Sequence, residues 1–274
     1  MNKASGPLAG KRVVITRAPE QSRALAAALE SLGAGVSWLP CVAFAPPEDP
    51  KPFDAALLKL AEFDWILFTS QNAVRFFSMR CRELGLPARP IESLQMYRPQ
   101  VAAVGPATER AAKLEGMRVD YVAKNYAGES LVEELRSSLK GREVLLPRSD
   151  RADARVLAAL QEAEARLTAV IAYRTLKPQS FDAAILDRIS RAEVDLLVFA
   201  SPSAFQNLSS VTGTGELAAL STRVQFAAVG ATTARSLRDA GLQVAIESTE
   251  ASASGIADAI AEFYQRRPLQ ARTS

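Results

Sequence analysis

The 274-residue sequence predicts a mixed α/β protein made of two similar domains, each built on a doubly wound parallel sheet. Three observations support this fold class. Short apolar runs of strand length alternate with segments of helical spacing. Small polar turns join these runs to the helices that follow them. Much of the sequence of the first half also returns in the second half, and each half is long enough to form a domain.

The first 84 residues are interpreted from their periodicity, their prolines and their glycines. Residues 36–44 are extended but contain Pro40, which favours an edge strand or a crossover between domains. Prolines 46, 47, 50 and 52 indicate a linker. The other predicted elements are a strand at 11–16, a helix at 22–32 that ends before Gly33, a strand at 65–69 and a helix at 72–84.

An irregular connection is expected at 85–99, which contains three prolines. Residues 101–123 then read as strand, turn, helix and strand. Pro106 is placed at the start of this helix and Gly116 at its end. A further helix is expected at 131–139.

An internal repeat extends through most of the chain. The segment FDWILFTSQNAVRFF at 63–77 returns as VDLLVFASPSAFQNL at 194–208, which is an offset of 131 residues. The same offset aligns the strand ends ITR and LPR, and with them Arg17 and Arg148. AAVGPATERAAKLEG at 102–116 returns at 227–241 as AAVGATTARSLRDAG, now at an offset of 125. The repeat indicates that the fold and the ligand site were duplicated together.

The composition excludes several classes of function. There is no histidine, which removes Ser–His and Cys–His nucleophiles and the commonest metal ligand. Neither a Walker loop nor a GxGxxG fingerprint is present, so we expect no metal and no cofactor. The net charge of +3, without a basic run, fits an anionic small molecule better than a nucleic acid.

The cellular compartment is inferred from the same composition. The N-terminus has no apolar run of the signal-peptide type, and no stretch approaches the roughly 20 apolar residues of a membrane span. The two cysteines, Cys41 and Cys81, are therefore expected to be reduced. The sequence predicts a cytoplasmic protein that binds neither nucleic acid nor membrane.

Polar turns at the carboxyl ends of the strands are candidate ligand contacts, because ligands of open α/β sheets bind at this edge. Ser70 and Asn72 lie in TSQN, and Ser201 and Ser203 lie in SPS. Free N–H groups at helix starts favour carboxylate or phosphate. All four residues are also ordinary helix caps, and this purely structural role stays open for each of them. The same two alternatives apply to Thr108, Thr232 and Thr233, which follow the Val-Gly turns.

Two arginines and one tyrosine complete the candidate site. Arg17 and Arg148 end the first strand of each copy and could clamp carboxylates, or pair locally with Glu20 and Asp150. Tyr173, in AVIAYRT, could simply pack at the crossover. In a chain without histidine, however, its hydroxyl is one of few candidate proton donors.

Taken in order, these motifs resemble those of the uroporphyrinogen-III synthase family. The resemblance is carried by ITRAPEQS, FDWILFTSQNAV, AAVGPAT, VLLPRS, YRT, VFASPSA and FAAVGATTARSLRDAG, and extends over about residues 11–262. It implies two flavodoxin-like α/β domains, joined by a two-stranded β connector, with the active site in the cleft between them. Mapped onto this chain, one domain comprises 1–39 plus 175–274 and the other 44–170, with crossovers at 40–43 and 171–174.

The resemblance also implies an activity, that of a cyclising lyase in tetrapyrrole and heme biosynthesis. Such an enzyme closes linear hydroxymethylbilane, an octacarboxylate, to uroporphyrinogen III. The last pyrrole ring is inverted through a spiro intermediate, and water is lost without a cofactor. Matching motifs assign Tyr173 as proton donor. The same motifs imply eleven substrate-binding residues: Arg17, Ser70, Asn72, Gly105, Thr108, Arg148, Ser201, Ser203, Gly230, Thr232 and Thr233.

We expect a monomer, and a transient contact with the preceding pathway enzyme stays open. Two alternatives belong to other classes. One is a sensor that holds an anionic tetrapyrrole without converting it, and the other is an exported two-lobed sugar- or amino-acid-binding protein. The first would usually carry an extra signalling segment and the second a signal peptide. The sequence shows neither feature, which favours the enzyme.

Overall fold

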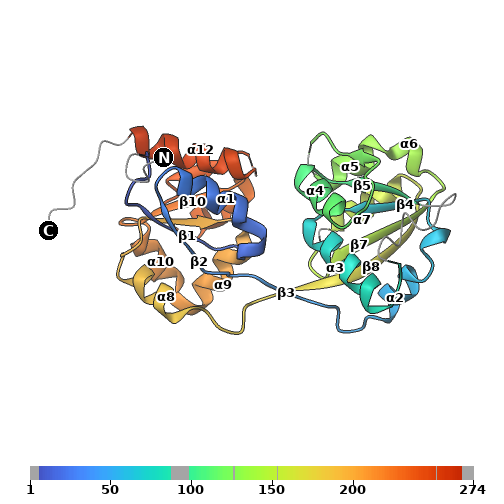
Figure 1. Cartoon of the computed structure of the whole chain (residues 1–274), viewed down its shortest axis with the longest axis horizontal. Coiled ribbons are helices and arrows are strands. Elements are labelled where there is room, and N and C mark those ends of the chain that lie inside the picture. The colour runs from blue at the N-terminus through green and yellow to red at the C-terminus, as the bar shows by residue number, and fades with distance from the viewer. Residues whose placement is uncertain (1–5, 88–98, 126, 153, 251, 267–274) are drawn as a thin grey trace. The chain divides into compact units, whose positions relative to one another are not determined.

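The computed structural model describes residues 6–87, 99–125, 127–152, 154–250 and 252–266. The chain divides into two compact units. Unit 1 comprises Met1–Ala43 and Leu176–Ser274, and unit 2 comprises Phe44–Thr175 (Figure 1). The predicted fold class is confirmed, because each unit carries helices packed on a sheet with a parallel core.

Unit 1 is a five-stranded sheet in the order β11-β10-β9-β1-β2. Its elements are β1 (Arg12–Ile15), α1 (Pro19–Ser31), β2 (Gly35–Trp38), α8 (Ala183–Ser190), β9 (Leu196–Phe199), α9 (Pro202–Thr212), α10 (Thr214–Leu220), β10 (Gln225–Val229), α11 (Ala231–Asp239), β11 (Ile246–Ser248) and α12 (Ala253–Arg266). The first strand lies between the second and the third in chain order. This is the order 2-1-3-4-5 of flavodoxin-like folds.

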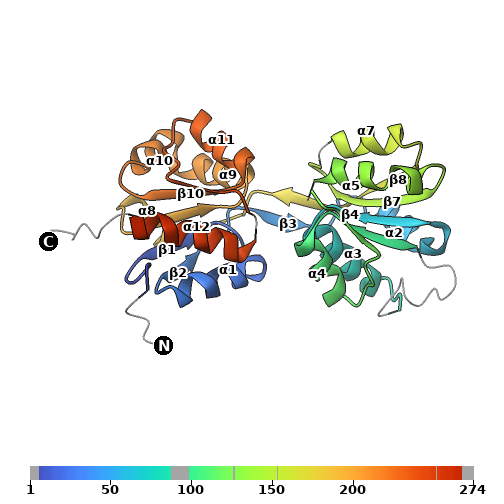
Figure 2. The same ribbon diagram turned by 90° about the horizontal axis from the view of Figure 1, so that it is seen from above.

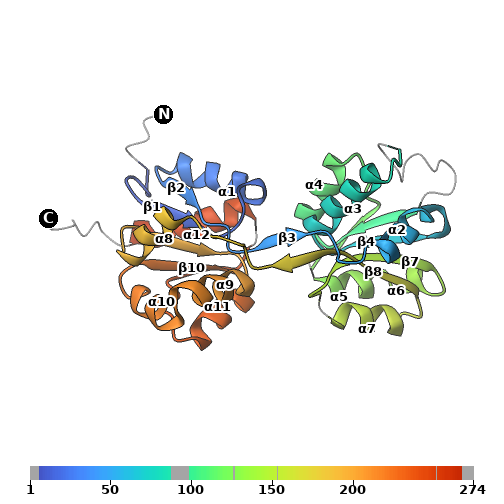
Figure 3. The same ribbon diagram turned by 90° about the horizontal axis from the view of Figure 1, so that it is seen from below.

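Both faces of the unit 1 sheet are covered, as the alternation of residues along β1 shows. Val13 and Ile15 belong to a core cluster with residues of α1 and α12. Val14, between them, belongs to a second cluster with residues of α8 to α11. Figures 2 and 3 show α1 and α12 on one face and α9, α10 and α11 on the other. Strands buried on both faces explain the near-continuous apolar runs of the sequence.

Unit 2 is a six-stranded sheet in the order β3-β8-β7-β4-β5-β6. Its elements are β3 (Ala43–Ala45), α2 (Lys51–Leu57), the 3-10 helix η1 (Leu60–Glu62), β4 (Trp65–Phe68), α3 (Gln71–Glu83), β5 (Gln100–Ala103), α4 (Pro106–Leu114), β6 (Tyr121–Val122), α5 (Gly128–Glu134), α6 (Arg136–Leu139), β7 (Glu143–Ser149), α7 (Ala154–Glu162) and β8 (Arg166–Leu176). Strands β8-β7-β4-β5-β6 repeat the spatial order of unit 1. In unit 2, however, the strands equivalent to β1 and β2 come last in the chain.

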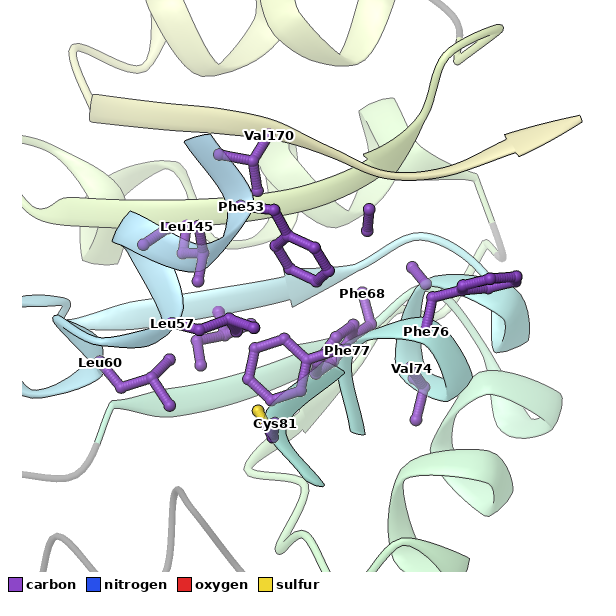
Figure 4. Packing of buried hydrophobic residues seen from close by; sticks show 14 of the residues in the cluster. Phe53, Leu57, Leu60, Phe68, Val74, Phe76, Phe77, Cys81, Leu145 and Val170 are labelled. Atoms are coloured by element: carbon purple, nitrogen blue, oxygen red, sulfur yellow. The ribbon is translucent and has the colours of Figure 1, made fainter. Parts of the chain in front are cut away.

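One face of the unit 2 sheet carries an aromatic core (Figure 4). Phe53 of α2 and Phe77 of α3 meet above β4, and Phe77 packs edge-on against Phe68 with ring centroids 5.3 Å apart. Leu145 of β7 and Val170 of β8 extend the same cluster. The opposite face packs against α5, α6 and α7.

Some predicted elements differ from the structure. The proline-rich linker leads directly into α2, with Pro52 in its first turn, where proline has no hydrogen bond to lose. The predicted helix 131–139 is two short helices that meet at Leu135. The extended segment 36–44 is split into β2 and β3, which belong to different sheets. Most of the predicted irregular connection, 88–98, lies outside the described residues.

The sequence repeat and the spatial units are out of phase. In unit 1, β1 from the first copy pairs in parallel with β9 from the second, with Ile15 opposite Val198. In unit 2, β4 from the first copy pairs with β7 from the second, with Ile66 opposite Leu145. Each sheet is therefore assembled from strands of both copies.

Two aspartates that the repeat retains have the same structural role. The Asp195 carboxylate accepts a hydrogen bond from the backbone N–H of Arg12 at 2.9 Å. The Asp64 carboxylate accepts one from the backbone N–H of Glu143, also at 2.9 Å. In each unit, the aspartate before one strand thus binds the start of the neighbouring strand and fixes the register of the central pair. Both hydrogen bonds lie at the amino end of their sheet, opposite the candidate site.

We propose that the two units are independently folding domains. Residues 44–175, expressed alone, should give a soluble α/β protein with a single cooperative thermal transition, because both core clusters of unit 2 consist only of residues from this segment. Circular dichroism and calorimetry check this expectation against the full chain. A segment without a cooperative transition would show that unit 2 needs the rest of the chain to fold.

Candidate active site

The candidate site of unit 2 is centred on the hydroxyl of Tyr173. This residue lies in β8, and its hydroxyl is 3.0 Å from the Oγ of Ser70, which follows β4. Ser70 also caps α3, because its Oγ accepts a hydrogen bond from the N–H of Ala73 at 3.0 Å. Ser70 therefore has the capping role and also contacts the Tyr173 hydroxyl, while its contact with a ligand stays a prediction. Asn72, in the first turn of α3, also interacts with the Tyr173 hydroxyl.

Aromatic packing holds the Tyr173 ring in place. The ring stacks on Phe76 with centroids 5.4 Å apart and meets Phe44 edge-on at 5.8 Å. Only 6% of the residue is exposed. Burial is the largest influence on the hydroxyl and raises its pKa above the ordinary value, while the hydrogen bonds with Ser70, Ser149 and Asn72 act in the opposite direction. The phenol is therefore protonated at neutral pH, as an unperturbed phenol also is, and the raised pKa makes it a weaker acid.

A polar network at the end of β7 anchors the strand that carries Tyr173. The N–H of Asp150 donates to the carbonyl oxygen of Tyr173 at 3.1 Å. The Asp150 carboxylate accepts hydrogen bonds from the Ser149 hydroxyl and from the N–H of Thr175, both at 2.9 Å. The hydroxyls of Ser149 and Thr175 are themselves 3.0 Å apart. The register between β7 and β8 shifts at Arg148 and Ser149, and this network stabilises the irregular pairing.

Sequence reasoning did not select Ser149, Asp150 or Thr175. They stand directly beside Arg148 and Tyr173 in the motifs VLLPRS and YRT. Polar residues at the end of a buried strand were the signal that could have found them.

Arg148 and Arg17 occupy equivalent strand ends in the two units. The Arg148 Nη1 donates to the carbonyl oxygen of Ser149 at 3.3 Å, and its buried Nε has no hydrogen-bond partner among the described residues. The Arg17 Nε donates to the Oε1 of Gln21 at 3.0 Å, and burial lowers the pKa of its guanidinium. Within the described residues, neither arginine forms an ion pair. The predicted alternatives of local pairing with Glu20 and Asp150 are therefore not seen.

The two Val-Gly turns begin helices in both units. Gly105 is the N-cap of α4, and Gly230 is the N-cap of α11. Gly230 has a φ of 81°, which favours glycine, and a Cβ at this position would meet open space. Thr108 and Thr233 are buried, with 4% and 3% of each residue exposed, whereas Thr232 is exposed. The two buried threonines pack in the first turns of their helices.

Ser201 in unit 1 repeats the capping geometry of Ser70. Its Oγ accepts a hydrogen bond from the N–H of Ala204 at 3.2 Å. Ser203 follows in the first turn of α9 and is half-buried. The residue that the repeat aligns with Tyr173 is Val42, which packs against the core of unit 1. The duplicated site therefore has its phenol in unit 2 alone.

The structure thus groups the predicted residues by unit. Ser70, Asn72 and Tyr173 interact directly, and Gly105, Thr108 and Arg148 lie at the same sheet edge of unit 2. The corresponding edge of unit 1 carries Arg17, Ser201, Ser203, Gly230, Thr232 and Thr233.

The two cysteines are not reactive groups of this site. Cys41 and Cys81 are free and buried, and burial raises the pKa of each thiol to about 12. Both thiols are therefore neutral and poor nucleophiles at neutral pH. Within the ranges that the structure describes, no three His, Cys, Asp or Glu side chains gather in a metal-binding group. No described helix is both long enough and apolar enough to cross a membrane.

The chain is similar in sequence to known proteins of one family. A family model described as "Uroporphyrinogen-III synthase HemD" matches residues 23–258. The uroporphyrinogen-III synthase of Synechococcus elongatus is 28% identical, over 96% of this chain and 99% of its own length.

Two solved structures support the fold. A variant of uroporphyrinogen III synthase from Thermus thermophilus superposes with a TM-score of 0.59 at 22% identity, covering 94% of this chain and all of its own. The Helicobacter pylori enzyme superposes with the same TM-score of 0.59 at 17% identity, covering 90% of this chain and 97% of its own. The family match over residues 23–258 settles the assignment: this chain belongs to the uroporphyrinogen-III synthase family.

Proposed function

We propose that this chain cyclises hydroxymethylbilane to uroporphyrinogen III with inversion of the last pyrrole ring. Family membership supports this activity, which is that of a cyclising lyase in tetrapyrrole biosynthesis. One structural observation carries the proposed mechanism. A buried, neutral phenol is held at the carboxyl edge of a parallel sheet, 3.0 Å from a helix-capping serine.

The reaction needs a proton donor rather than a strong base. Loss of the hydroxymethyl hydroxyl breaks a C–O bond, and the departing oxygen takes up a proton to leave as water. We assign that proton to the Tyr173 hydroxyl, which Ser70 and Asn72 hold in place. The substituted α-carbon of the last ring then attacks the exposed carbon and gives the spiro intermediate. The bond between that α-carbon and its original bridging carbon breaks, and the free α-carbon of the same ring bonds to the bridging carbon. The proton lost from the free α-carbon balances the one that Tyr173 gave to the departing water. Ring inversion depends on how the chain is folded when it reacts, so positioning supplies the selectivity.

Carboxylate binding is the second task of the proposed site. The substrate carries eight carboxylates, and free N–H groups at the starts of α3, α4, α9 and α11 are suitable partners. Arg17 and Arg148 add cationic donors that no described acidic side chain neutralises. The proposed contacts from unit 1 are Ser201, Ser203, Gly230, Thr232 and Thr233.

The setting of the reaction is part of the proposal. The enzyme acts as a monomer in the cytoplasm without a cofactor, and hydroxymethylbilane is its small-molecule partner. Two free cysteines are compatible with a reducing compartment. A transient contact with the enzyme that supplies the bilane remains open to test by cross-linking.

The activity is tested by a coupled assay. Bilane generated in situ is incubated with the purified protein, oxidised, and resolved into type I and type III porphyrins by chromatography. Type III should predominate, because unaided closure gives the uninverted type I isomer. If the folded protein gave type I alone at the uncatalysed rate, the synthase function would be rejected. A protein that binds a tetrapyrrole without converting it would then be the better description.

Replacing Tyr173 tests the proton donor. Tyr173→Phe removes the hydroxyl and keeps the ring that stacks on Phe76, so turnover should fall by about tenfold or more while the melting temperature stays close to that of the wild type. The wild-type rate should be maintained up to the ordinary phenol pKa of 10.0 and decline only above it, because burial raises the pKa of the donor. That alkaline decline should be missing from the variant.

Tyr264→Phe is a matched control for this variant. The Tyr264 hydroxyl donates to the carbonyl oxygen of Asp195 at 3.2 Å, at the amino end of the unit 1 sheet. Its loss should leave turnover unchanged. Equal rates for wild type and Tyr173→Phe would remove Tyr173 from the chemistry.

The two strand-end arginines are tested together. Arg17→Gln with Arg148→Gln should raise KM more than it lowers kcat, because the pair binds carboxylates that are present before and after ring closure. The corresponding double lysine variant should fall between this variant and the wild type, since lysine keeps the charge but not the forked geometry. A loss confined to kcat would instead mean that the arginines act in the transition state.

A further inference from the structure

Many arginines of this chain pair with acidic side chains, among them Arg12 with Asp195 at an amino edge and Arg155 with Glu129 at a carboxyl edge. Others have no acidic partner among the described residues, and several of these lie at the carboxyl edges. Four of these, Arg23, Arg75, Arg110 and Arg235, share one position in their helices.

Each of the four is the fifth residue of a helix that begins at the carboxyl edge. The helices are α1, α3, α4 and α11, which are 9 to 13 residues long. All four side chains are exposed. Because a helical Cα–Cβ bond leans toward the amino end of its helix, an arginine one turn from the start can extend its guanidinium to the sheet edge. We call these four residues the rim arginines.

The local charges do not account for this placement. A cation near the amino end of a helix gains nothing from the helix dipole, which favours anions there. The first turns of α3 and α11 contain no acidic residue. In α4 the one acidic residue, Glu109, pairs with Lys113 at 2.6 Å and so does not neutralise Arg110. The first turn of α1 does contain Glu20, so the lack of an acidic neighbour that compensates the arginine holds for α3, α4 and α11. Local rules that are broken without compensation are expected at functional sites.

The repeat retains one of these positions in both copies. Arg110 and Arg235 align at the offset of 125. Each lies five residues after the glycine of its Val-Gly turn. Several other positions of the two helices differ in type, among them Glu109, which aligns with Ala234, and Leu114, which aligns with Asp239. The arginine was therefore kept while its neighbours in the helix changed.

We propose that the rim arginines form a carboxylate-binding rim in each unit, which recognises the peripheral acid groups of a polycarboxylate tetrapyrrole. This assignment rests on the proposed function and extends it to residues that contribute charge from outside the proton-donating centre. Arg75 and Arg110 serve unit 2, on the adjoining helices α3 and α4. Arg23 and Arg235 serve unit 1. Exposed ion pairs are individually weak, so the rim acts through several arginines together.

The chain offers a matched control for these variants. Arg188 and Arg223 also form no ion pair among the described residues, but they lie at the amino edge of unit 1, near the end of α8 and just before β10. Three double variants are compared with the wild type: Arg23→Gln with Arg235→Gln, Arg75→Gln with Arg110→Gln, and the control Arg188→Gln with Arg223→Gln. All three lose two positive charges, so a nonspecific effect of net charge would appear equally in each.

Binding is measured by fluorescence titration with uroporphyrin III, an octacarboxylate, and with coproporphyrin III, a tetracarboxylate. Each rim variant should raise the Kd for uroporphyrin by about threefold to thirtyfold at low ionic strength, the range that two exposed ion pairs provide. The increase should shrink in high salt, because salt screens exposed charges. It should also be smaller for coproporphyrin. The Kd of the control variant should stay within about twofold of the wild-type value. The melting temperatures of all three variants should stay within a few degrees of that of the wild type.

The two proposals fail in different ways. Rim variants that bind uroporphyrin as tightly as the control variant would overturn the carboxylate rim, whether or not the wild type is active. A wild type that binds uroporphyrin through the rim but forms no type III product would overturn the synthase activity alone. In the coupled assay, the rim variants should raise KM and leave kcat nearly unchanged.

Discussion

The pairing of β7 with both β4 and β8 is the constraint on which the site of unit 2 depends. Tyr173 and Ser70 are 103 residues apart in the chain, and they meet because β7 lies between the strands that carry them. Parallel strands bring their carboxyl ends to one edge, so the end of each strand supplies a group to the same place. The Asp64 carboxylate fixes the central pair at the other end of the sheet through the N–H of Glu143.

Duplication gave the chain two similar edges that have since acquired different chemistry. Ser70 and Ser201 cap their helices in the same way, with φ and ψ angles that agree within a degree. Only Ser70 meets a phenol, because the residue equivalent to Tyr173 is Val42. The proposed function can use such an arrangement. In that proposal, helix starts bind carboxylates in both copies, whereas one proton donor is needed.

The packing of Tyr173 determines the state of its hydroxyl. Phenols ordinarily titrate near pH 10 and are weak acids at neutral pH. Packing between Phe44 and Phe76 places the Tyr173 ring in a poorly solvated position, and its hydroxyl remains protonated. The hydrogen bonds with Ser70 and Asn72 orient the hydroxyl. This position costs little in stability, because the ring belongs to a core cluster of unit 2.

By itself, the sequence determined the fold class, the family and most strand–turn–helix units, because periodicity and capping are local properties of the chain. It also identified the polar turns after the strands, and Tyr173 as a candidate. The split of residues 36–44 into β2 and β3, and the use of Ser70 as both cap and phenol partner, were decided only by the tertiary structure. So was the network that joins Ser149, Asp150 and Thr175. The physical reason is that these features depend on which strands become neighbours, and such pairing unites residues that are far apart in the chain.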